Sequence, residues 1–331
     1  MNSKSDQKEG SHVKRGNVRR IYGDVPPFMG VSYVKPSEAI EADAVVLGMP
    51  FDGLATFRGG PNRRAPQEIR KYSLLFGDYN IEWDIRIFDY LNVIDIGDVD
   101  VFPGDTKESF SRLERWISSI VSAHAVPLMI GGDHAVSYPA VRAVVESLQR
   151  PVGFIVFDTH LDFQESLEGD RLTRASPTLR ICELERVDPR NVVIIGARGA
   201  RNAAEWGPRA KKMGVKIFTM ADVEREGIQA IAEKARELAS PNGVPPYVSV
   251  DVDGIDPAYA PATNSPEPGG LTSREIITAI REVASQGVSG FDVVEVSPEY
   301  DNESGTTSIL AARLMEEVLC AIAAVRRNAP T

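Results

Sequence analysis

The sequence predicts an α/β protein in three layers, with helices on both faces of a doubly wound, mainly parallel sheet of eight strands. Short runs rich in β-branched residues recur along the chain, and most are apolar throughout rather than alternating. That pattern is typical of parallel strands that are covered on both faces. Amphipathic stretches of helical period lie between the runs. Repetition of strand, helix and strand indicates βαβ units within one sheet.

The elements follow one another in a regular order along the chain. The predicted strands are Ala44–Met49, Val93–Ile96, Pro127–Ile130, Val152–Phe157, Val192–Ile195, Val215–Phe218, Tyr247–Val252 and Phe291–Val296. The predicted helices include Lys107–Ser122, Tyr138–Leu148, Ala221–Leu238, Ser273–Ser285 and Thr307–Arg326. We see no repeat, low-complexity tract or long Pro/Gly linker that would divide the chain. Residues 21–331 are therefore expected to form a single catalytic domain, preceded by a disordered polar leader at residues 1–20.

Composition excludes several classes of protein. The chain has 331 residues and a net charge of -10, which argues against nucleic acid as a partner because phosphate binding needs a basic surface. Its two cysteines, Cys182 and Cys320, are far apart, so we expect no zinc ribbon and no disulfide framework. Neither a signal peptide nor a run of about 18 apolar residues is present. We expect a cytoplasmic protein that neither spans nor binds a membrane.

Acidic and imidazole side chains gather where four of the predicted strands end. In doubly wound sheets, ligands bind outside the carboxyl ends of the strands. The residues at these ends are His134 after Pro127–Ile130, Asp158, His160 and Asp162 after Val152–Phe157, Asp251 and Asp253 out of Tyr247–Val250, and Glu295 after Phe291–Val294. The pattern predicts one site built from four separate segments.

The spacing of these side chains indicates a pair of metal ions. Residues two apart in extended backbone face the same side, so Asp158, His160 and Asp162 would converge, as would Asp251 and Asp253. Five or six donors are too many for one catalytic metal with an open position. They fit two ions roughly 3.5–4 Å apart that share carboxylates, with a hydroxide between them. Carboxylate mixed with imidazole suits Mn²⁺, Ni²⁺, Co²⁺, Fe²⁺ or Zn²⁺ better than Mg²⁺ or Ca²⁺.

Each of these residues also has a structural interpretation. A lone buried histidine is more often a core residue than a ligand, and an aspartate at a strand end is often a helix N-cap. The chain has four histidines, of which His12 lies in the leader and His124 at the end of a predicted helix. His134 and His160 both fall in acidic motifs at strand ends. Chance is a poor explanation for that coincidence.

At this point the sequence resembles the ureohydrolase family, which contains arginases, agmatinases and related hydrolases of guanidino compounds. The resemblance runs from about Asp43 to Arg326, and its motifs are specific only when taken together. They are GGDH at Gly131–His134, DTHLD at Asp158–Asp162, SVDVDGIDPAYAP at Ser249–Pro261, SPEPGGLTSRE at Ser265–Glu275 and FDVVEVSPEYD at Phe291–Asp301.

The resemblance implies a role for each matching residue. One metal would be held by His134, Asp158, Asp162 and Asp251, and the other by Asp158, His160, Asp251 and Asp253. The family metal is usually Mn²⁺, with Ni²⁺ in some members. Glu295 would bind the substrate guanidinium, a role that suits a carboxylate because it pairs with that planar fork. Asp162 would protonate the leaving nitrogen. The expected products are urea and an amine.

Three departures from the family pattern fall in loops that would face the substrate. Arg174 stands where many arginases and agmatinases carry a histidine, and arginine cannot shuttle protons at neutral pH. It would repel a cationic tail and favour an anionic or small neutral one; alternatively it is exposed and inert. Asn264 lies in Ala262–Ser265, where two family glycines are replaced by larger residues that would reshape the pocket. The loop Thr56–Arg70 also differs.

The sequence therefore predicts an agmatinase-like hydrolase with ordinary chemistry and an open choice of substrate. Guanidine, a guanidino acid, or an alkylated guanidine or biguanide such as metformin are alternatives to agmatine. A single-zinc amidohydrolase would explain neither Glu295 nor the full ligand set. A non-catalytic subunit that stabilises a homologous partner is a third hypothesis, although such a chain should have lost a ligand. The family implies a homo-oligomer, a trimer or hexamer.

Overall fold

The computed structural model describes residues 26–35, 40–53, 58, 61–102 and 104–328. The predicted leader at residues 1–20 lies outside these residues, as do positions 56, 57, 59 and 60 of the distinctive loop Thr56–Arg70. Within the described ranges, no helix combines the length and the apolar character needed to cross a membrane.

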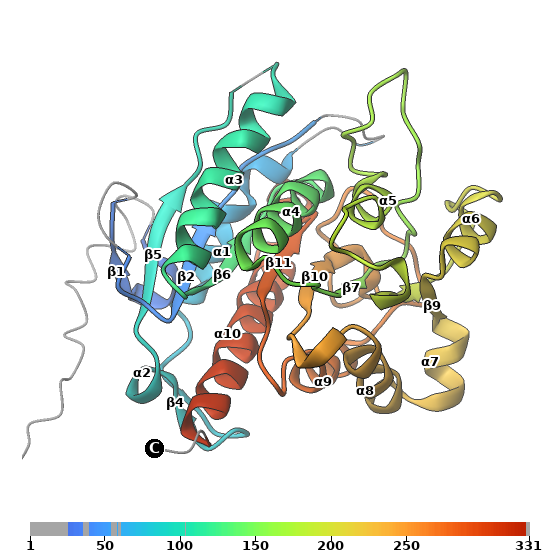
Figure 1. Ribbon diagram of the computed structural model, residues 1–331. Helices are drawn as coiled ribbons and strands as arrows, with labels where there is room; N and C mark the ends of the chain where they lie inside the picture. Colours follow the sequence, from blue (N-terminus) through green and yellow to red (C-terminus); the bar gives the residue numbers. More distant parts are fainter. Residues whose placement is uncertain (1–25, 36–39, 54–57, 59–60, 103, 329–331) are drawn as a thin grey trace, which may run out of the picture.

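A parallel sheet forms the centre of the molecule (Figure 1). Its strand order is β1-β5-β2-β6-β11-β10-β7-β8-β9, and every neighbouring pair in it is parallel. The strands are β1 (Ser32–Tyr33), β2 (Ala44–Gly48), β5 (Val93–Asp98), β6 (Val126–Ile130), β7 (Phe154–Phe157), β8 (Val192–Ala197), β9 (Lys216–Thr219), β10 (Tyr247–Asp251) and β11 (Gly290–Val294). A separate antiparallel hairpin joins β3 (Tyr79–Asn80) to β4 (Ile85–Arg86).

The fold class predicted from the sequence is confirmed, with one strand more than expected. All eight predicted strands are present with small shifts at their ends. The ninth, β1, has two residues with exposed side chains and pairs with β5 at the edge of the sheet. A strand this short and exposed leaves no apolar run for sequence analysis to detect.

Two layers of helices bury the two faces of the sheet. On one face, alternate strand residues such as Val46, Ile155 and Val293 pack into one apolar core with helices α1, α2, α7, α8, α9 and α10. On the other face, residues such as Val45 and Val156 pack with α3, α4, α5 and α6. This arrangement explains why the strand sequences are apolar throughout.

The helices are bounded as follows: α1 (Ala65–Ser73), α2 (Ile87–Tyr90), α3 (Thr106–Ser122), α4 (Ser137–Leu148), α5 (Pro177–Cys182), α6 (Trp206–Met213), α7 (Met220–Glu226), α8 (Ile228–Leu238), α9 (Ser273–Val283) and α10 (Thr306–Arg327). The single helix predicted over Ala221–Leu238 is wrong, because the chain divides there into α7 and α8. Gly227 separates them with φ 80 and ψ 144, a conformation that ends a helix and that glycine adopts readily. The helical spacing of apolar residues continues across Gly227, so the sequence pattern did not reveal the break between the two helices.

The topology brings four chain segments together at one edge of the sheet. Strands β6, β11, β10 and β7 are consecutive neighbours, and all four are parallel. Their carboxyl ends therefore meet, although they lie as far apart as residues 130 and 294 in the sequence. Gly132 allows one of these loops to pack closely, since a Cβ there would lie 1.8 Å from the carbonyl oxygen of Phe51.

Candidate metal centre and active site

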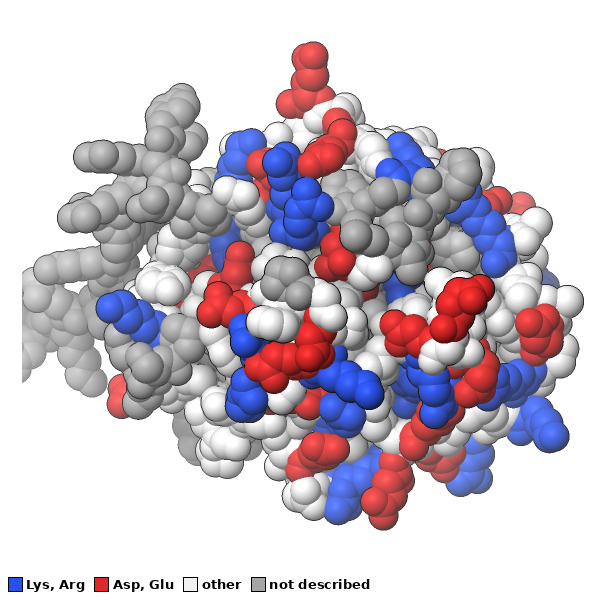
Figure 2. Space-filling view, turned by 90° about the horizontal axis from the view of Figure 1, so that it is seen from above, with Lys and Arg blue, Asp and Glu red and all other residues white. Residues whose placement is uncertain are grey.

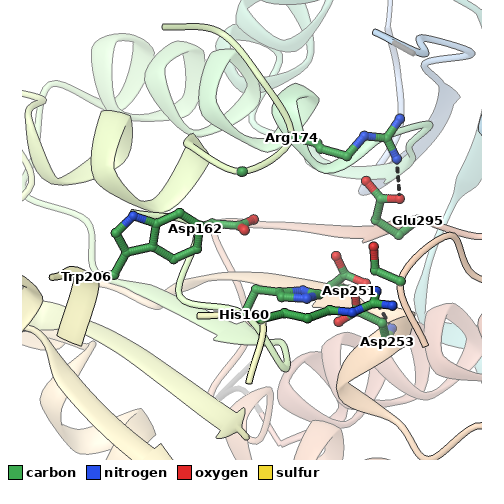
Figure 3. Close-up of a pocket in the computed structure, with 10 residues that line it drawn as sticks. His160, Asp162, Arg174, Trp206, Asp251, Asp253 and Glu295 are labelled. Atoms are coloured by element: carbon green, nitrogen blue, oxygen red, sulfur yellow. Dashed lines mark hydrogen bonds and ion pairs between the residues drawn. The ribbon is translucent and has the colours of Figure 1, made fainter. Parts of the chain in front are cut away.

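A cavity of about 220 Å³ lies at the carboxyl ends of these four strands. Six residues singled out from the sequence line it: His160, Asp162, Arg174, Asp251, Asp253 and Glu295 (Figure 3). His134 and Asp158 lie beneath them, each 1% exposed. The walls also contain Arg201 and Trp206, which the sequence analysis did not identify, and Ser265, the last residue of the altered segment Ala262–Ser265.

One ring nitrogen of His134 faces three carboxylates at once. Its Nδ1 lies 3.1 Å from Asp158 Oδ2, 2.9 Å from Asp162 Oδ2 and 3.2 Å from Asp251 Oδ2. Neither Nδ1 nor Asp158 Oδ2 has a hydrogen-bond partner of acceptable geometry, although both atoms are buried. Buried polar atoms are rarely left in this state. Converging donors of this kind fit a cation among them.

A second group surrounds His160. Its Nδ1 lies 3.1 Å from Asp253 Oδ2 and 3.4 Å from Asp158 Oδ1. Ligand atoms of His134, Asp158 and Asp251 lie within 4.8 Å of one another, and so do those of Asp158, His160 and Asp253. Asp158 belongs to both groups and offers one oxygen to each histidine. The described residues thus present candidate ligands for two divalent ions that share a carboxylate.

The prediction that these ligands converge because they alternate along extended backbone is wrong in part. Asp253 and Asp162 are not extended, so alternation along a strand does not align them with Asp251 or Asp158. Asp253 lies in the 3₁₀ turn Val252–Gly254, whose N-cap is Asp251. Asp162 has a left-handed backbone, with φ 52, and Glu295 does as well, with φ 64. Non-glycine residues held in this region are strained and cluster at functional sites.

A polar chain behind His134 orients its ring, and the sequence analysis missed it. His134 Nε2 lies 3.3 Å from Ser249 Oγ, which donates to Asp292 Oδ1 at 2.5 Å. The Tyr247 hydroxyl donates to the other oxygen of Asp292 at 2.8 Å. Because Ser249 uses its proton on Asp292, it accepts from Nε2–H, which leaves the lone pair of Nδ1 directed at the carboxylates. Metal-binding histidines are commonly held in this way.

The sequence contained a signal for this polar chain of hydrogen-bonded side chains. Ser249 and Asp292 interrupt two otherwise apolar strands, β10 and β11. Both side chains are fully buried. A buried polar residue in a central strand needs a partner, and that requirement alone marks such positions.

The cluster holds more negative charge than its burial favours. Burial, with the charges of Asp253 and Asp158, raises the pKa of Asp251 well above its ordinary value. Burial and the Asp158 charge raise the pKa of Asp162 to about 6, although His134 acts in the opposite direction. Burial opposes charge on His134, yet the carboxylates facing it raise its pKa well above the ordinary value. Divalent cations would relieve this repulsion, which supports a metal centre.

Glu295 lies beside the metal ligands and is paired with Arg174. Glu295 Oε1 accepts from the backbone N–H of His134 at 2.8 Å, and Oε2 accepts from Arg174 Nη1 at 2.7 Å. Burial raises the pKa of Glu295 to about 7, although the Arg174 charge lowers it. The Arg174 side chain is only 10% exposed. The alternative that Arg174 is exposed is therefore wrong, because its side chain is buried against Glu295.

Asn264 is placed differently from the other predicted substrate residue. Its side chain is 1% exposed and donates to Asn62 Oδ1 at 2.5 Å. Asn62 in turn donates to Glu295 Oε2 at 3.4 Å. Asn264 therefore lies behind the cavity wall, whereas its neighbour Ser265 lines the cavity. Through Asn62, Asn264 is connected to Glu295.

Figure 2 shows the charged side chains on the face seen from above the view of Figure 1. Among the described residues of this face, acidic and basic side chains are interspersed, and no extended basic area is seen.

Comparison with known proteins identifies relatives over almost the whole chain. A model of the arginase family matches residues 42–321. Proclavaminate amidinohydrolase of Streptomyces clavuligerus is 36% identical over 94% of this chain and 97% of its own. Its solved structure superposes with a TM-score of 0.84, covering 92% of this chain and 99% of that one. Guanidinobutyrase of Pseudomonas aeruginosa is 34% identical over 95% of this chain and 97% of its own, and agmatinase of Bacillus cereus is 33% identical over 88% and 96%.

Proposed function

Because this chain belongs to the arginase family of metal-dependent hydrolases, we propose that it cleaves a guanidino C–N bond and releases urea and an amine. One observation carries the proposal: five carboxylate and imidazole ligands converge around the shared Asp158, with Asp162 2.9 Å from His134 Nδ1 and Glu295 beside them. Neither a single-metal site nor a structural cluster needs that number of donors.

The residues of the site would divide the work of the reaction. Two divalent ions, when bound, would supply a nucleophilic hydroxide at neutral pH and stabilise charge that develops on the attacked group. Glu295 would hold the planar guanidinium by paired hydrogen bonds, so that its carbon faces the metal ligands. Asp162 would carry the proton to the leaving nitrogen, and its position at the cavity wall gives it access to that atom.

We infer Mn²⁺ as the first choice of metal and Ni²⁺ as the second. A set of four carboxylates and two imidazoles accommodates either ion. The Nδ1 atoms of both histidines face the carboxylates, so a borderline metal would find imidazole and carboxylate donors together. Removal of metal by a chelator should abolish urea release, and its return with each ion separately should identify the effective one.

The substrate belongs to the guanidino compounds, and agmatine is the starting hypothesis. Relatives named for a guanidino acid and for agmatine are about equally similar to this chain, at 34% and 33% identity. We also propose a cytoplasmic homo-oligomer, a trimer or hexamer. Cys182 and Cys320 are buried free thiols, which suits a reducing compartment.

The direct test is urea release by the purified protein, loaded separately with Mn²⁺ and with Ni²⁺. The panel should contain agmatine, arginine, guanidinobutyrate, guanidinopropionate, guanidine and metformin. Asp251→Ala is expected to lower kcat by at least about 1,000-fold, because it removes a ligand of the metal centre. Asp188→Ala, at an exposed turn, is the matched control and should change nothing.

One observation favours a second candidate, a non-catalytic subunit of a hetero-oligomeric enzyme. The carboxylate expected to bind substrate, Glu295, is already bound to Arg174. Silence on every substrate with both metals bound would contradict the hydrolase and support this alternative. Co-expression with an active homologue would then show whether this chain increases the partner's activity.

A further inference from the structure

The guanidinium of Arg174 lies where a substrate guanidinium is expected. Its Nη1 donates to Glu295 Oε2 at 2.7 Å, and its Nη2 donates to Asp52 Oδ1 at 3.0 Å and reaches Asp133 Oδ2 at 3.4 Å. In Figure 3 the side chain points toward Glu295, away from Trp206 and Asp162. The guanidinium of Arg174 is therefore hydrogen-bonded to the carboxylate that would orient the substrate.

Glu295 Oε2 already accepts two hydrogen bonds, from Arg174 Nη1 at 2.7 Å and from Asn62 Nδ2 at 3.4 Å. Its Oε1 accepts from the backbone N–H of His134 at 2.8 Å and keeps one lone pair, whereas both lone pairs of Oε2 are in use. A planar guanidinium binds a carboxylate best through two parallel hydrogen bonds. Binding of a substrate guanidinium through two hydrogen bonds to Glu295 therefore requires one donor to leave Oε2, and Arg174 Nη1 is the cationic donor that the substrate guanidinium would replace.

The contacts of Arg174 allow Nη1 to move while the rest of the side chain stays in the site. The Nη2 group is held by Asp52 and Asp133, independently of Glu295. Arg174 also lines a second cavity of about 180 Å³, whose wall includes Thr173, Leu172 and Asp133. The guanidinium can therefore turn about its anchored edge into space that is already present.

We propose that Arg174 is a specificity-determining residue that exchanges Glu295 for an anionic group of the substrate. The proposal rests on the hydrolase function proposed above and names its substrate class: guanidino compounds that carry a carboxylate. The incoming guanidinium takes Glu295 Oε2, and the released Nη1 donates to the substrate carboxylate. Both buried charges keep a partner, as burial of charge requires.

A purely cationic substrate offers Arg174 no such partner. Agmatine carries an ammonium tail, and that tail would meet the freed Nη1 as a like charge. Arg201 is exposed and lines the same cavity. It adds a second positive charge to the walls, which further favours an anionic tail.

The test compares the protein with Arg174→Met, Arg174→Lys and Arg201→Met, each loaded with metal. Binding of guanidinoacetate, guanidinopropionate, guanidinobutyrate and agmatine is measured by calorimetry, and urea release is measured in parallel. Arg171→Met is the control, because Arg171 lies in the same loop, is 52% exposed and pairs with Glu165 and Glu183. Thermal unfolding shows whether each variant is folded.

We expect the unmodified protein to bind its best guanidino acid about tenfold or more tightly than agmatine. Arg174→Met should reduce this ratio by at least about tenfold, with weaker binding of the acid and tighter binding of agmatine. The ratio for Arg174→Lys should fall between those of the unmodified protein and Arg174→Met, because lysine keeps the charge but cannot span Asp52 and the substrate. The control should keep the original ratio.

Two results would overturn the proposal. One is an unchanged ratio in Arg174→Met, and the other is loss of the preference in Arg201→Met alone, which would make Arg201 the anionic-group site. Binding does not depend on turnover, so it separates this proposal from the hydrolase itself. If no substrate yields urea but the binding preference follows Arg174, the site assignment stands and the catalytic function fails.

Discussion

Two buried arginines of this chain make similar ion pairs with different consequences. Arg70, on α1, is 3% exposed; it binds Asp95 at 2.7 and 3.0 Å, the carbonyl of Gly97 at 3.0 Å, and Asp98. Arg174, on a loop, is 10% exposed and has carboxylates on both of its terminal nitrogens. Arg70 lines neither active-site cavity, whereas Arg174 lines both.

The difference lies in what the partners of each arginine are free to do. Asp95 also accepts from the backbone of Phe28 and Gly97, so Arg70 fastens a strand end to a helix and a loop. Glu295 faces a cavity and the metal ligands, so a substrate can compete for it. Burial and charge pairing alone thus do not identify a functional arginine; an adjoining space and an exchangeable partner do.

The largest effect expected from this comparison is on stability. Arg70→Met should lower the free energy of unfolding by about 3–5 kcal/mol, because it leaves Asp95 buried without its cation. Chemical denaturation with a two-state fit would measure it, and the preference among guanidino substrates should not change. Arg86→Met removes an exposed pair with Asp78 and should cost less than about 1 kcal/mol. Equal losses from the two variants would contradict a structural role specific to Arg70.

The next effect concerns the polar chain behind the metal ligands. Ser249→Ala removes the acceptor of His134 Nε2 and leaves Asp292 without its 2.5 Å hydrogen bond. We expect metal affinity to fall by roughly 10- to 100-fold, with the fold intact. Titration with Mn²⁺ against a fluorescent chelator would show it. Ser285→Ala, on the surface beyond α9, provides the control, and unchanged affinity in Ser249→Ala would refute the orienting role.

The smallest expected effect is a dependence of the free energy of unfolding on pH. It arises from Asp162 and from Glu295, the partner of Arg174. The pKa of Asp162 is raised to about 6 and that of Glu295 to about 7, in each case first by burial. Carboxyl groups with raised pKa values stabilise the fold while protonated, fully below about pH 4, and this contribution is lost as pH rises through 6 and 7. The metal-free protein should therefore lose on the order of a few degrees of Tm between pH 5 and pH 8.

Bound metal should reverse this dependence. Ligands must be deprotonated to bind a cation, so the rise in Tm on addition of Mn²⁺ should increase with pH. Differential scanning calorimetry with chelator and with Mn²⁺ would compare the two states. Glu295→Gln should weaken the dependence of Tm on pH in the metal-free protein, whereas Arg70→Lys should retain that dependence. A metal-free Tm that rises with pH would contradict the assigned shifts.

The candidate ligands could be found from the sequence because each stands directly after an apolar strand. A parallel strand has to be apolar on both faces, so the first charged residue after it marks the sheet edge. The wrong detail, alternation of Asp251 and Asp253 along an extended strand, arose because the strand gives way to a 3₁₀ turn at Val252. Local turn geometry depends on hydrogen bonds that the residue pattern does not specify.

The sequence by itself determined the fold class, the strand ends that build the site and the chemistry of its ligands. These depend on hydrophobic periodicity and residue type, which are local properties of the chain. Only the tertiary structure decided that Arg174 turns inward onto Glu295, 121 residues away, and that Ser249 and Asp292 meet behind His134. Pairing between distant loops follows from how whole layers pack, and no local pattern encodes that geometry.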